Sequence, residues 1–192
     1  MKINEIFYSI QGEGFFTGTP AVFVRFAGCN LACDFCDTNH QGYKEYTEDE
    51  IIAEIKKYTV NHVVLTGGEP TLQITKSFID KLHEAGKFIQ VETNGTIPLG
   101  HDIEFDINWI TCSPKHKPAS IGRINELKVV YQGQDMSQYD GLKALPYCFY
   151  LQPCDTKDEQ KNRENLQATI DYIMQHPKWR LSLQTQKIIN VR

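Results

Sequence analysis

The chain has 192 residues, of which 41% are hydrophobic and 23% charged, as is typical of a globular protein with one well-buried core. Its formal net charge of -4 excludes the basic field of a nucleic-acid-binding protein. Residues 1–5 lack a signal-peptide pattern, and no apolar run approaches the length of a membrane span. We therefore expect a single domain over residues 1–192 in the cytoplasm, with reduced thiols, no membrane and no direct nucleic-acid partner.

The first predicted elements are two strands joined by a glycine-containing turn. Residues 3–10 alternate as a strand does and end in residues 11–14, Gln-Gly-Glu-Gly. The two glycines allow either a plain turn or a close approach to a ligand. Residues 21–26 form an apolar strand that carries Arg25. This arginine is either a surface charge or a bidentate clamp for a carboxylate.

Three cysteines follow in one short loop at C-x3-C-x2-C spacing, namely Cys29, Cys33 and Cys36. Three thiolates suit three corners of an iron-sulfur cubane, and the missing fourth cysteine would leave one iron open. A structural zinc site usually needs a second cysteine or histidine pair, which this sequence lacks. A redox C-x-x-C pair would leave Cys29 unused. We rank an open iron-sulfur cluster above zinc, and zinc above a redox pair.

The rest of the chain alternates helices and strands. A helix is predicted over residues 47–58, because Thr47 and Glu50 form a capping box before an isoleucine stripe. A strand over residues 62–66 runs into residues 67–70, Gly-Gly-Glu-Pro, and then a helix to about residue 85. The glycine pair either makes a tight turn or presents bare backbone to a ligand. Further strands are predicted over residues 88–92, 109–112, 127–131, 148–151 and 180–185, with a long helix over about 158–175.

The predicted strands end in polar or glycine-rich turns, and α/β barrels bind ligands at the carboxyl ends of their strands. We expect those ends to converge with the cysteine loop. A complete barrel needs roughly 250 residues, and several connections here are too short for a full helix. The predicted fold class is α/β, an incomplete and open α/β barrel with fewer helices than strands. Its open side needs cover, which favours a homodimer.

The cysteine spacing resembles the cluster loop of radical S-adenosylmethionine enzymes. The resemblance implies a 4Fe-4S cluster whose open iron binds S-adenosylmethionine, so that electron transfer yields a 5'-deoxyadenosyl radical. Residues 67–70 resemble the glycine-rich motif of that superfamily, which contacts the methionine amine. The fold expected above is the one that this superfamily uses.

A larger set of motifs resembles the 7-carboxy-7-deazaguanine synthase family. These motifs are residues 9–14 (Ser-Ile-Gln-Gly-Glu-Gly), Arg25, residues 36–38 (Cys-Asp-Thr), 92–95 (Glu-Thr-Asn-Gly), 113–115 (Ser-Pro-Lys) and 183–185 (Leu-Gln-Thr). The likeness implies a small dimeric carbon-nitrogen lyase that contracts 6-carboxy-5,6,7,8-tetrahydropterin to 7-carboxy-7-deazaguanine with loss of ammonia, a step toward queuosine and other 7-deazapurines. S-adenosylmethionine would be regenerated, Mg²⁺ required, and the electron donor flavodoxin- or ferredoxin-like.

The same resemblance implies a role for each matching residue. Cluster ligands are Cys29, Cys33 and Cys36. Contacts to S-adenosylmethionine are Phe35, Cys36, Asp37, Gly68, Ser113, Pro114, Lys115, Gln152, Pro153, Cys154 and Asp155. Substrate contacts are Ile10, Gln11, Gly12, Arg25, Thr66 and Arg192, with Arg25 on the substrate carboxylate and Arg192 acting through a C-terminal carboxylate. Thr38 would bind Mg²⁺, and no protein acid or base is assigned.

Alternatives remain at single residues and for the whole chain. Thr38 could cap a turn, and Lys115 could be a solvated charge. At Gln186 many members have a histidine, whereas glutamine hydrogen-bonds but cannot become a cation. A glycyl-radical-enzyme activating enzyme shares the cysteine spacing, but it needs a protein partner and no carboxylate clamp. A zinc-stabilised binding protein would hold zinc without sulfide. Residues 11–14 together with Arg25 favour the small-molecule enzyme.

Overall fold

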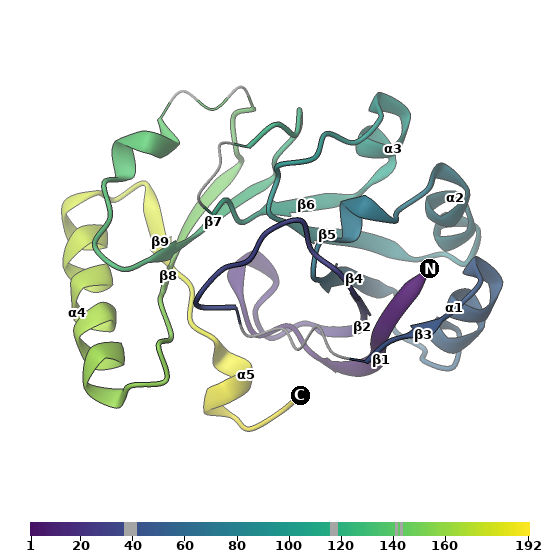
Figure 1. The fold of residues 1–192 in the computed structure, drawn as a ribbon, viewed down its shortest axis with the longest axis horizontal. Helices are drawn as coiled ribbons and strands as arrows, with labels where there is room; N and C mark the ends of the chain where they lie inside the picture. The colour runs from purple at the N-terminus through teal and green to yellow at the C-terminus, as the bar shows by residue number, and fades with distance from the viewer. Residues whose placement is uncertain (37–41, 116–118, 141, 143) are drawn as a thin grey trace.

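A computed structural model of the chain describes residues 1–36, 42–115, 119–140, 142 and 144–192. Within them nine strands form one sheet in the order β3-β1-β2-β4-β5-β6-β7-β8-β9 (Figure 1). The strands are β1 (Lys2–Ile10), β2 (Pro20–Phe26), β3 (Lys44–Glu45), β4 (His62–Gly67), β5 (Phe88–Thr93), β6 (Trp109–Cys112), β7 (Glu126–Tyr131), β8 (Cys148–Pro153) and β9 (Trp179–Leu181). The α-helices are α1 (Glu48–Ile55), α2 (Lys76–Glu84), α3 (His101–Asp106), α4 (Glu159–Gln175) and α5 (Thr185–Ile188).

The sheet curls but does not close. Strands β2 and β4 to β9 pair in parallel, whereas β1 is antiparallel to β2 and β3 is antiparallel to β1. The edge strands β3 and β9 have no pairing with each other in the described part of the chain. Five α-helices stand against nine strands there. The predicted open α/β barrel with fewer helices than strands is confirmed.

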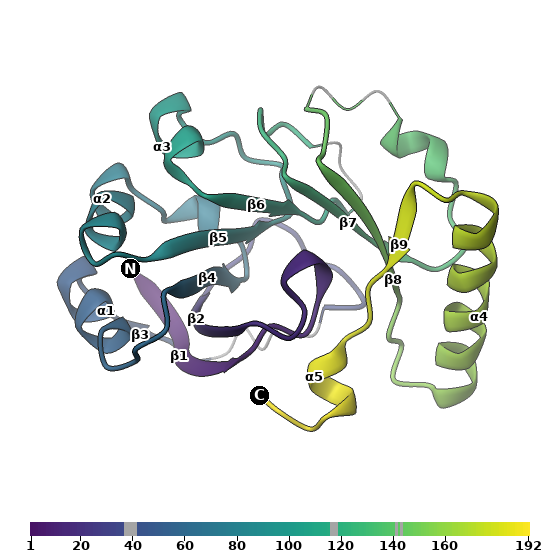
Figure 2. The ribbon, with the colours of Figure 1, turned by 180° about the vertical axis from the view of Figure 1, so that it is seen from behind.

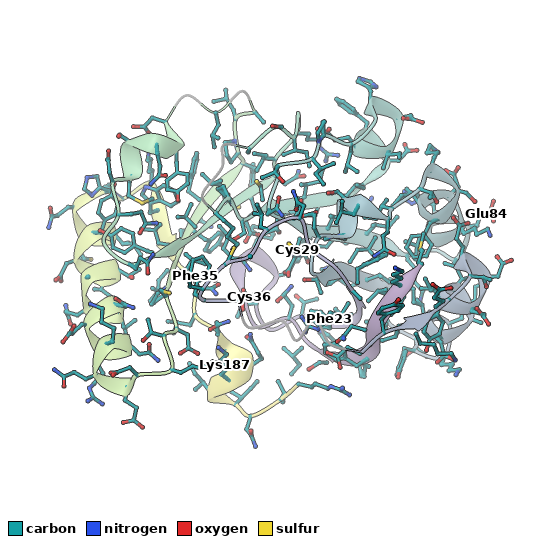
Figure 3. All side chains as sticks on the ribbon, viewed as in Figure 1. Phe23, Cys29, Phe35, Cys36, Glu84 and Lys187 are labelled. Atoms are coloured by element: carbon teal, nitrogen blue, oxygen red, sulfur yellow. The ribbon has the colours of Figure 1, made fainter. Side chains whose placement is uncertain are left out.

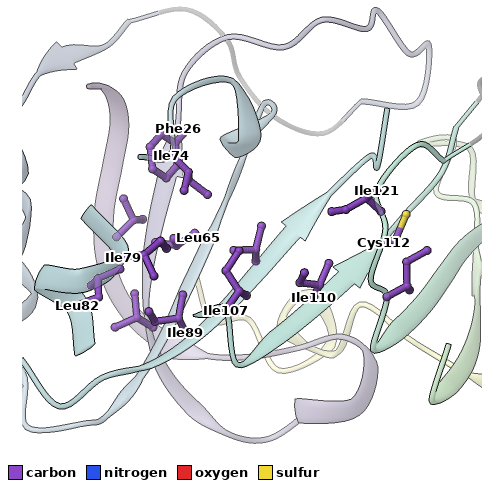
Figure 4. Close-up of a cluster of buried hydrophobic side chains, with 14 of the residues drawn as sticks. Phe26, Leu65, Ile74, Ile79, Leu82, Ile89, Ile107, Ile110, Cys112 and Ile121 are labelled. Atoms are coloured by element: carbon purple, nitrogen blue, oxygen red, sulfur yellow. The ribbon is translucent and has the colours of Figure 1, made fainter. Parts of the chain in front are cut away.

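The main core lies between the sheet and the helices. Helices α1, α2 and α3 follow one another along one side of the molecule, and α4 covers β8 and β9 on the other (Figures 1 and 2). Successive side chains of a strand point to opposite faces. In β4, Val63 and Leu65 therefore join the large apolar cluster of Figure 4, while Val64 packs with Phe7 and Phe23 on the other face. That second face carries the polar side chains of the site.

Helix α1 forms where its capping signals predict it. The Thr47 hydroxyl accepts a hydrogen bond from the Glu50 N–H at 3.2 Å, and the Glu50 carboxylate accepts one from the Thr47 N–H at 2.8 Å. Ile51, Ile52 and Ile55 are buried, as the isoleucine stripe requires. The helix ends at Ile55, three residues before the predicted end, because residues 56–58 continue as a turn.

Two predicted elements differ from the structure. Residues 180–185 do not form one strand, since β9 ends at Leu181 and α5 begins at Thr185. The helix expected directly after Gly-Gly-Glu-Pro starts only at Lys76 and is preceded by a short 3-10 turn, Pro70–Leu72. Strand β3 and helix α3, at two and six residues, were not predicted, since they are too short to give a clear periodic signal.

The C-terminal segment, residues 182–192, passes between β9 and the first hairpin (Figure 2). The Gly14 N–H donates to Ser182 Oγ at 3.0 Å, the Thr185 N–H donates to the Gly12 carbonyl at 3.0 Å, and Ser9 Oγ donates to the Arg192 carbonyl at 2.6 Å. The open side of the barrel therefore has cover from its own chain. No helix within the described residues combines the length and the apolar character needed to cross a bilayer.

Candidate active site

A cavity of about 610 Å³ opens at the carboxyl ends of the parallel strands. This volume has room for a cofactor together with a small substrate. Its lining combines the first hairpin, the cysteine loop, the ends of β2 and β4 to β8, and the C-terminal segment: Glu13, Arg25, Cys29, Leu31, Cys33, Asp34, Phe35, Cys36, Thr66, Gly67, Gly68, Glu92, Thr93, Asn94, Ser113, Lys115, Lys128, Val130, Gln132, Gln152, Pro153, Cys154, Asp155, Thr156, Lys157, Gln184, Gln186 and Lys187. The predicted convergence of strand ends with the cysteine loop is confirmed.

Most of the predicted site residues line this cavity, but not all of them. Ile10, Gln11, Gly12, Pro114 and Arg192 are outside the lining. Gln11 reaches the site through Glu92, whose Oε1 accepts a hydrogen bond from Gln11 Nε2 at 2.9 Å. The predictions for Asp37 and Thr38 concern positions outside the described residues.

The cysteine loop, which includes Phe35, lines the cavity. Cys29, Phe35 and Cys36 lie far from peripheral residues such as Glu84 (Figure 3). Cys29 and Cys33 have partly exposed side chains, and Cys36 has an exposed one. None of the three forms a disulfide, and the Cys36 N–H donates to the Cys33 carbonyl at 3.1 Å. Burial raises the pKa of the Cys33 thiol, while the Lys115 ammonium acts in the opposite direction. In the described part of the chain, no three potential ligands converge on the position of one metal ion. Thiolates that bind separate irons of a cluster need no such point, so this finding agrees with a cluster on the loop as well as with none.

The Gly67-Gly68 pair lets β4 touch the start of the cysteine loop. Gly67 has a φ of +115°, and a Cβ atom there would lie 2.3 Å from the Phe26 carbonyl oxygen. A Cβ atom on Gly68 would lie 2.0 Å from the carbonyl oxygen of Gly28. The two glycines therefore allow a close approach between two segments of backbone, and in the structure the segment that approaches them is the chain's own residues 26–28. This contact fixes the cysteine loop to the end of β4.

Glu69 is the buried acceptor that ties this turn to β5. Its carboxylate is fully buried and accepts hydrogen bonds from Thr71, from Thr93 Oγ1 at 2.7 Å and from the Asn94 N–H at 2.8 Å. The side-chain nitrogen of Asn94, Nδ2, in turn lies 3.9 Å from Cys29 Sγ. A buried carboxylate is stable only when such donors surround it. Glu69, the glutamate of the Gly-Gly-Glu-Pro motif, thus supports the cysteine loop through Asn94.

The floor of the cavity holds a buried ion pair that the sequence did not indicate. The Lys128 ammonium contacts a Glu13 carboxylate oxygen, and both side chains are largely inaccessible. The other Glu13 oxygen accepts hydrogen bonds from Gln184 Nε2 and Gln186 Nε2, each at 3.0 Å. Burial favours a higher pKa for Glu13, but Lys128 and the two amides outweigh it and lower the pKa to about 2. Gln186, the position where the family pattern departs, therefore holds Glu13.

A second polar group lies on the neighbouring strands. Thr66 Oγ1 donates to Glu92 Oε2 at 2.9 Å, while the other carboxylate oxygen of Glu92 accepts the hydrogen bond from Gln11. Arg25 lies beside Thr66 in the β2–β4 register, and its Nε donates to Glu5 Oε1 at 2.8 Å. Arg25 lines the cavity with 27% of its side chain exposed. A guanidinium in this setting can bind a carboxylate in a bidentate manner.

The far wall brings several predicted cofactor contacts together. Lys115 Nζ donates to Ser113 Oγ at 2.9 Å and lies 5.5 Å from the centroid of the Phe35 ring. This lysine is therefore part of the cavity rather than a solvated charge. Lys187 Nζ contacts Asp155 Oδ2 at 2.6 Å. Hydrogen bonds from Lys187, the Lys157 N–H and Asn162 lower the pKa of Asp155 to about 2.

Comparisons with known proteins show the superfamily and the family to which this chain belongs. Residues 23–107, which include the cysteine loop and the Gly-Gly-Glu-Pro turn, match the family model of the Radical SAM superfamily. The chain is 56% identical to a 7-carboxy-7-deazaguanine synthase of Bacteroides thetaiotaomicron, with 100% of this chain and 98% of that protein covered. A synthase of the same name from Burkholderia multivorans is 39% identical, with 98% of each chain covered. The chain belongs to the 7-carboxy-7-deazaguanine synthase family.

The solved structures agree with this assignment. The crystal structure of QueE from Escherichia coli matches 96% of this chain and 93% of its own, with a TM-score of 0.72 and 28% identity. Streptococcus suis SuiB, 17% identical with a TM-score of 0.50, shares the fold alone. Membership of a family of radical SAM lyases sets aside both the zinc-stabilised binding protein and the activating enzyme.

Proposed function

We propose that this chain contracts 6-carboxy-5,6,7,8-tetrahydropterin to 7-carboxy-7-deazaguanine with loss of ammonia, as a radical S-adenosylmethionine lyase in the synthesis of queuosine and other 7-deazapurines. The observation that carries the proposal is the cavity itself. One space of about 610 Å³ is lined both by the three loop cysteines and by Arg25. A radical precursor and a carboxylated substrate can therefore meet in it.

The cluster end of the cavity is assigned to Cys29, Cys33 and Cys36. Three soft thiolates on one loop suit a 4Fe-4S cluster with one open iron. When bound, the cluster and S-adenosylmethionine supply the 5'-deoxyadenosyl radical. The cofactor is assigned to residues of the loop and to residues at or after the ends of β4, β6 and β8: Phe35, Cys36, Asp37, Gly68, Ser113, Pro114, Lys115, Gln152, Pro153, Cys154 and Asp155. The lining of the cavity supports most of these positions.

The substrate end is assigned to the β1–β2 side. Arg25 pairs with the substrate carboxylate, which fixes the orientation of the pterin. Thr66 and the backbone of Ile10, Gln11 and Gly12 contact the ring. The position of Gln11 against Glu92 supports this, because Glu92 and Thr66 both line the cavity. Arg192 completes the set from the C-terminal segment. The protein's part is to bind, orient and exclude water, and no side chain is assigned as an acid or base.

Further parts of the proposal rest on the resemblance and on general chemistry. Mg²⁺ binds Thr38 and oxygens of the substrate, as suits a cation that keeps few protein ligands. The electron donor is a flavodoxin- or ferredoxin-like protein. The enzyme is a homodimer whose whole chain, residues 1–192, forms one radical SAM core. Its location is the cytoplasm, where the six cysteines of the chain, none of which forms a disulfide in the structure, stay reduced.

The test is anaerobic reconstitution with iron and sulfide, followed by addition of the carboxytetrahydropterin, S-adenosylmethionine, reductant and magnesium. We expect a 7-carboxy-7-deazaguanine peak by mass spectrometry, which vanishes in Cys33→Ala. Cys148→Ala is the matched control, because that buried thiol does not line the cavity. A cluster that cleaves S-adenosylmethionine without forming the deazaguanine would refute the substrate.

The carboxylate clamp has its own test. Arg25→Ala should raise the KM for the pterin at least tenfold, the order expected for a lost charge-assisted hydrogen bond. The cluster absorbance should stay as in the wild type. Arg163→Ala removes an exposed arginine of α4 and serves as the control. An Arg25→Ala variant that loses the cluster would contradict the assignment, because the defect would then be structural.

A further inference from the structure

Arg25 belongs to a group of four side chains at the edge of the cavity, namely Glu5, Phe7, Arg25 and Arg192. Glu5 and Arg25 are directly opposite each other in the antiparallel β1–β2 register, and the next pair on the same face is Phe7 with Phe23. Glu5 Oε1 accepts the hydrogen bond from Arg25 Nε at 2.8 Å. Glu5 Oε2 contacts Nη2 of Arg192. One carboxylate thus joins a residue of β2 to a residue of the C-terminal segment.

Both guanidinium groups also lie against the same aromatic ring. Arg25 Cζ is 5.6 Å and Arg192 Cζ is 5.1 Å from the centroid of Phe7. Phe7 is in turn stacked on Phe23 at 5.0 Å between centroids. Cations within about 6 Å of a ring are attracted to its face. Phe7 is 6% exposed and packed on Phe23, so the ring is a buried surface against which both guanidinium groups lie.

The way in which Glu5 holds Arg25 determines what Arg25 can bind. An arginine side chain has many rotamers, and a clamp is effective only when few of them are populated. Glu5 takes the Nε donor, which leaves the terminal nitrogen atoms of the guanidinium for another acceptor. Arg25 lines the cavity whereas Glu5 does not. Glu5 therefore acts from behind the arginine and does not face the substrate.

The charges of Glu5, Arg25 and Arg192 together favour the binding of an anion by Arg25. Glu5 alone would neutralise Arg25 and weaken its attraction for an anion. Counted over side chains alone, Arg192 gives the Glu5–Arg25–Arg192 group one net positive charge, and its own side chain is 69% exposed, away from the cavity lining. Arg192 also keeps Oε2 occupied, so that Oε1 remains on Arg25. The segment that covers the open side of the barrel thereby supports the clamp.

We propose that Glu5 is a positioning residue for Arg25, and that the Arg192 side chain holds Glu5 in place when the C-terminal segment is docked. The inference rests on the proposed function, because it takes Arg25 as the carboxylate clamp. It adds a residue of β1 and a side chain of the C-terminal segment to the determinants of substrate specificity. Neither of them needs to touch the substrate.

The test compares ligands with and without a carboxylate. Binding of 7-carboxy-7-deazaguanine and of 7-deazaguanine to the reconstituted enzyme is measured for the wild type, Glu5→Gln, Arg192→Met and Arg25→Ala. We expect Glu5→Gln to weaken the carboxylated ligand about tenfold and to leave 7-deazaguanine unchanged. The KM for the pterin should rise by a similar factor with little change in kcat. Glu54→Gln, which removes the exposed Lys57–Glu54 ion pair, is the matched control.

A double-mutant cycle tests the route of the effect. If Glu5 acts through Arg25, Glu5→Gln adds nothing in an Arg25→Ala background. Arg192→Met removes only an exposed side chain, so it keeps the proposal testable even if Glu5→Gln folds poorly. It should weaken the carboxylated ligand about threefold, and this effect should vanish in an Arg25→Ala background.

Failure of this inference differs from failure of the proposed function. Equal weakening of both ligands by Glu5→Gln would mean a structural role and would overturn the inference. The inference would also be overturned if Glu5→Gln bound the carboxylated ligand as tightly as the wild type while Arg25→Ala bound it more weakly. An Arg25→Ala variant with unchanged affinity for the carboxylated ligand would instead refute the clamp, and a wild type that makes no deazaguanine would refute the proposed reaction.

Discussion

Lys128 is the buried cation about which the acidic side chains of the cavity floor are arranged. It contacts Glu13 directly, and Glu92 and Glu126 lie close enough to act on its charge. Burial favours a lower pKa for this lysine, but the three carboxylates outweigh burial and raise the pKa above its ordinary value. Lys128 therefore stays charged, and its loss would leave Glu13 without its counter-ion.

We expect Lys128→Met to lower the free energy of unfolding by about 3–5 kcal/mol, because it leaves a buried carboxylate unpaired. Adding Glu13→Gln to it should recover part of that loss, since the double variant has no unpaired buried charge. Urea titration of the three variants measures both effects. Strictly additive losses would show that Glu13 and Lys128 do not act as a pair.

The same pair predicts a dependence on pH. The folded-state pKa of Glu13, about 2, lies below the ordinary value of 4.5. A lowered pKa contributes stability that is complete above the unfolded value and is lost as the pH falls toward the folded one. The stability difference between the wild type and Glu13→Gln should therefore shrink by about 2 kcal/mol between pH 6 and pH 3. A difference that stays constant over this range would contradict the ionised state of Glu13.

At the scale of single elements, the sequence predicts what short-range physics decides. Capping box and stripe locate α1, and buried runs locate β4, β5 and β6 within a residue or two. The stretch 180–185 reads as a strand by composition, yet it breaks after Leu181 because Ser182 and Gln184 bind the first hairpin. Such a contact joins residues about 170 positions apart, and no local pattern reports it.

The same distinction holds for the site. The cysteine loop and the glycine turn are contiguous motifs, so their convergence could be expected. Lys128 stands between two apolar residues of an ordinary strand and belongs to no motif. Glu92 begins the motif of residues 92–95, but the sequence does not show that it holds Gln11 and Thr66. Glu5 becomes relevant only because the hairpin register sets it opposite Arg25. These side chains are found from the register of the strands and not from their sequence neighbours.

Helix α1 offers a test of the capping argument. Thr47→Ala removes the hydroxyl that accepts the Glu50 N–H and should lower the free energy of unfolding by about 1 kcal/mol. Thr47→Ser keeps that hydroxyl and is the matched control. Equal losses in the two variants would assign the effect to the threonine methyl group and not to the cap. Because α1 is remote from the cavity lining, turnover by the folded enzyme should not change.

At the scale of the whole molecule, the cavity joins the two ends of the chain. Glu13 and Arg25 come from the first hairpin, whereas Gln152, Gln184 and Lys187 come from β8 and the C-terminal segment. The sheet itself makes no ladder between its two edges in the described residues. Contacts across that opening are single hydrogen bonds, such as the backbone bond from Thr185 to Gly12 and the side-chain bonds from Gln184 and Gln186 to Glu13. A ligand that fills the cavity adds contacts where the sheet has none.

S-adenosylmethionine should therefore stabilise the reconstituted protein against heat. At 100 times its Kd, a ligand of the folded state alone adds about 2.7 kcal/mol, which corresponds to about 5–10 °C in Tm for a chain of this size. Anaerobic thermal unfolding with and without the cofactor measures the shift. Cys33→Ala, which cannot hold the complete cluster, should show a much smaller one. An equal shift in that variant would mean that the cofactor binds without the cluster, and that the cysteine loop does not anchor it.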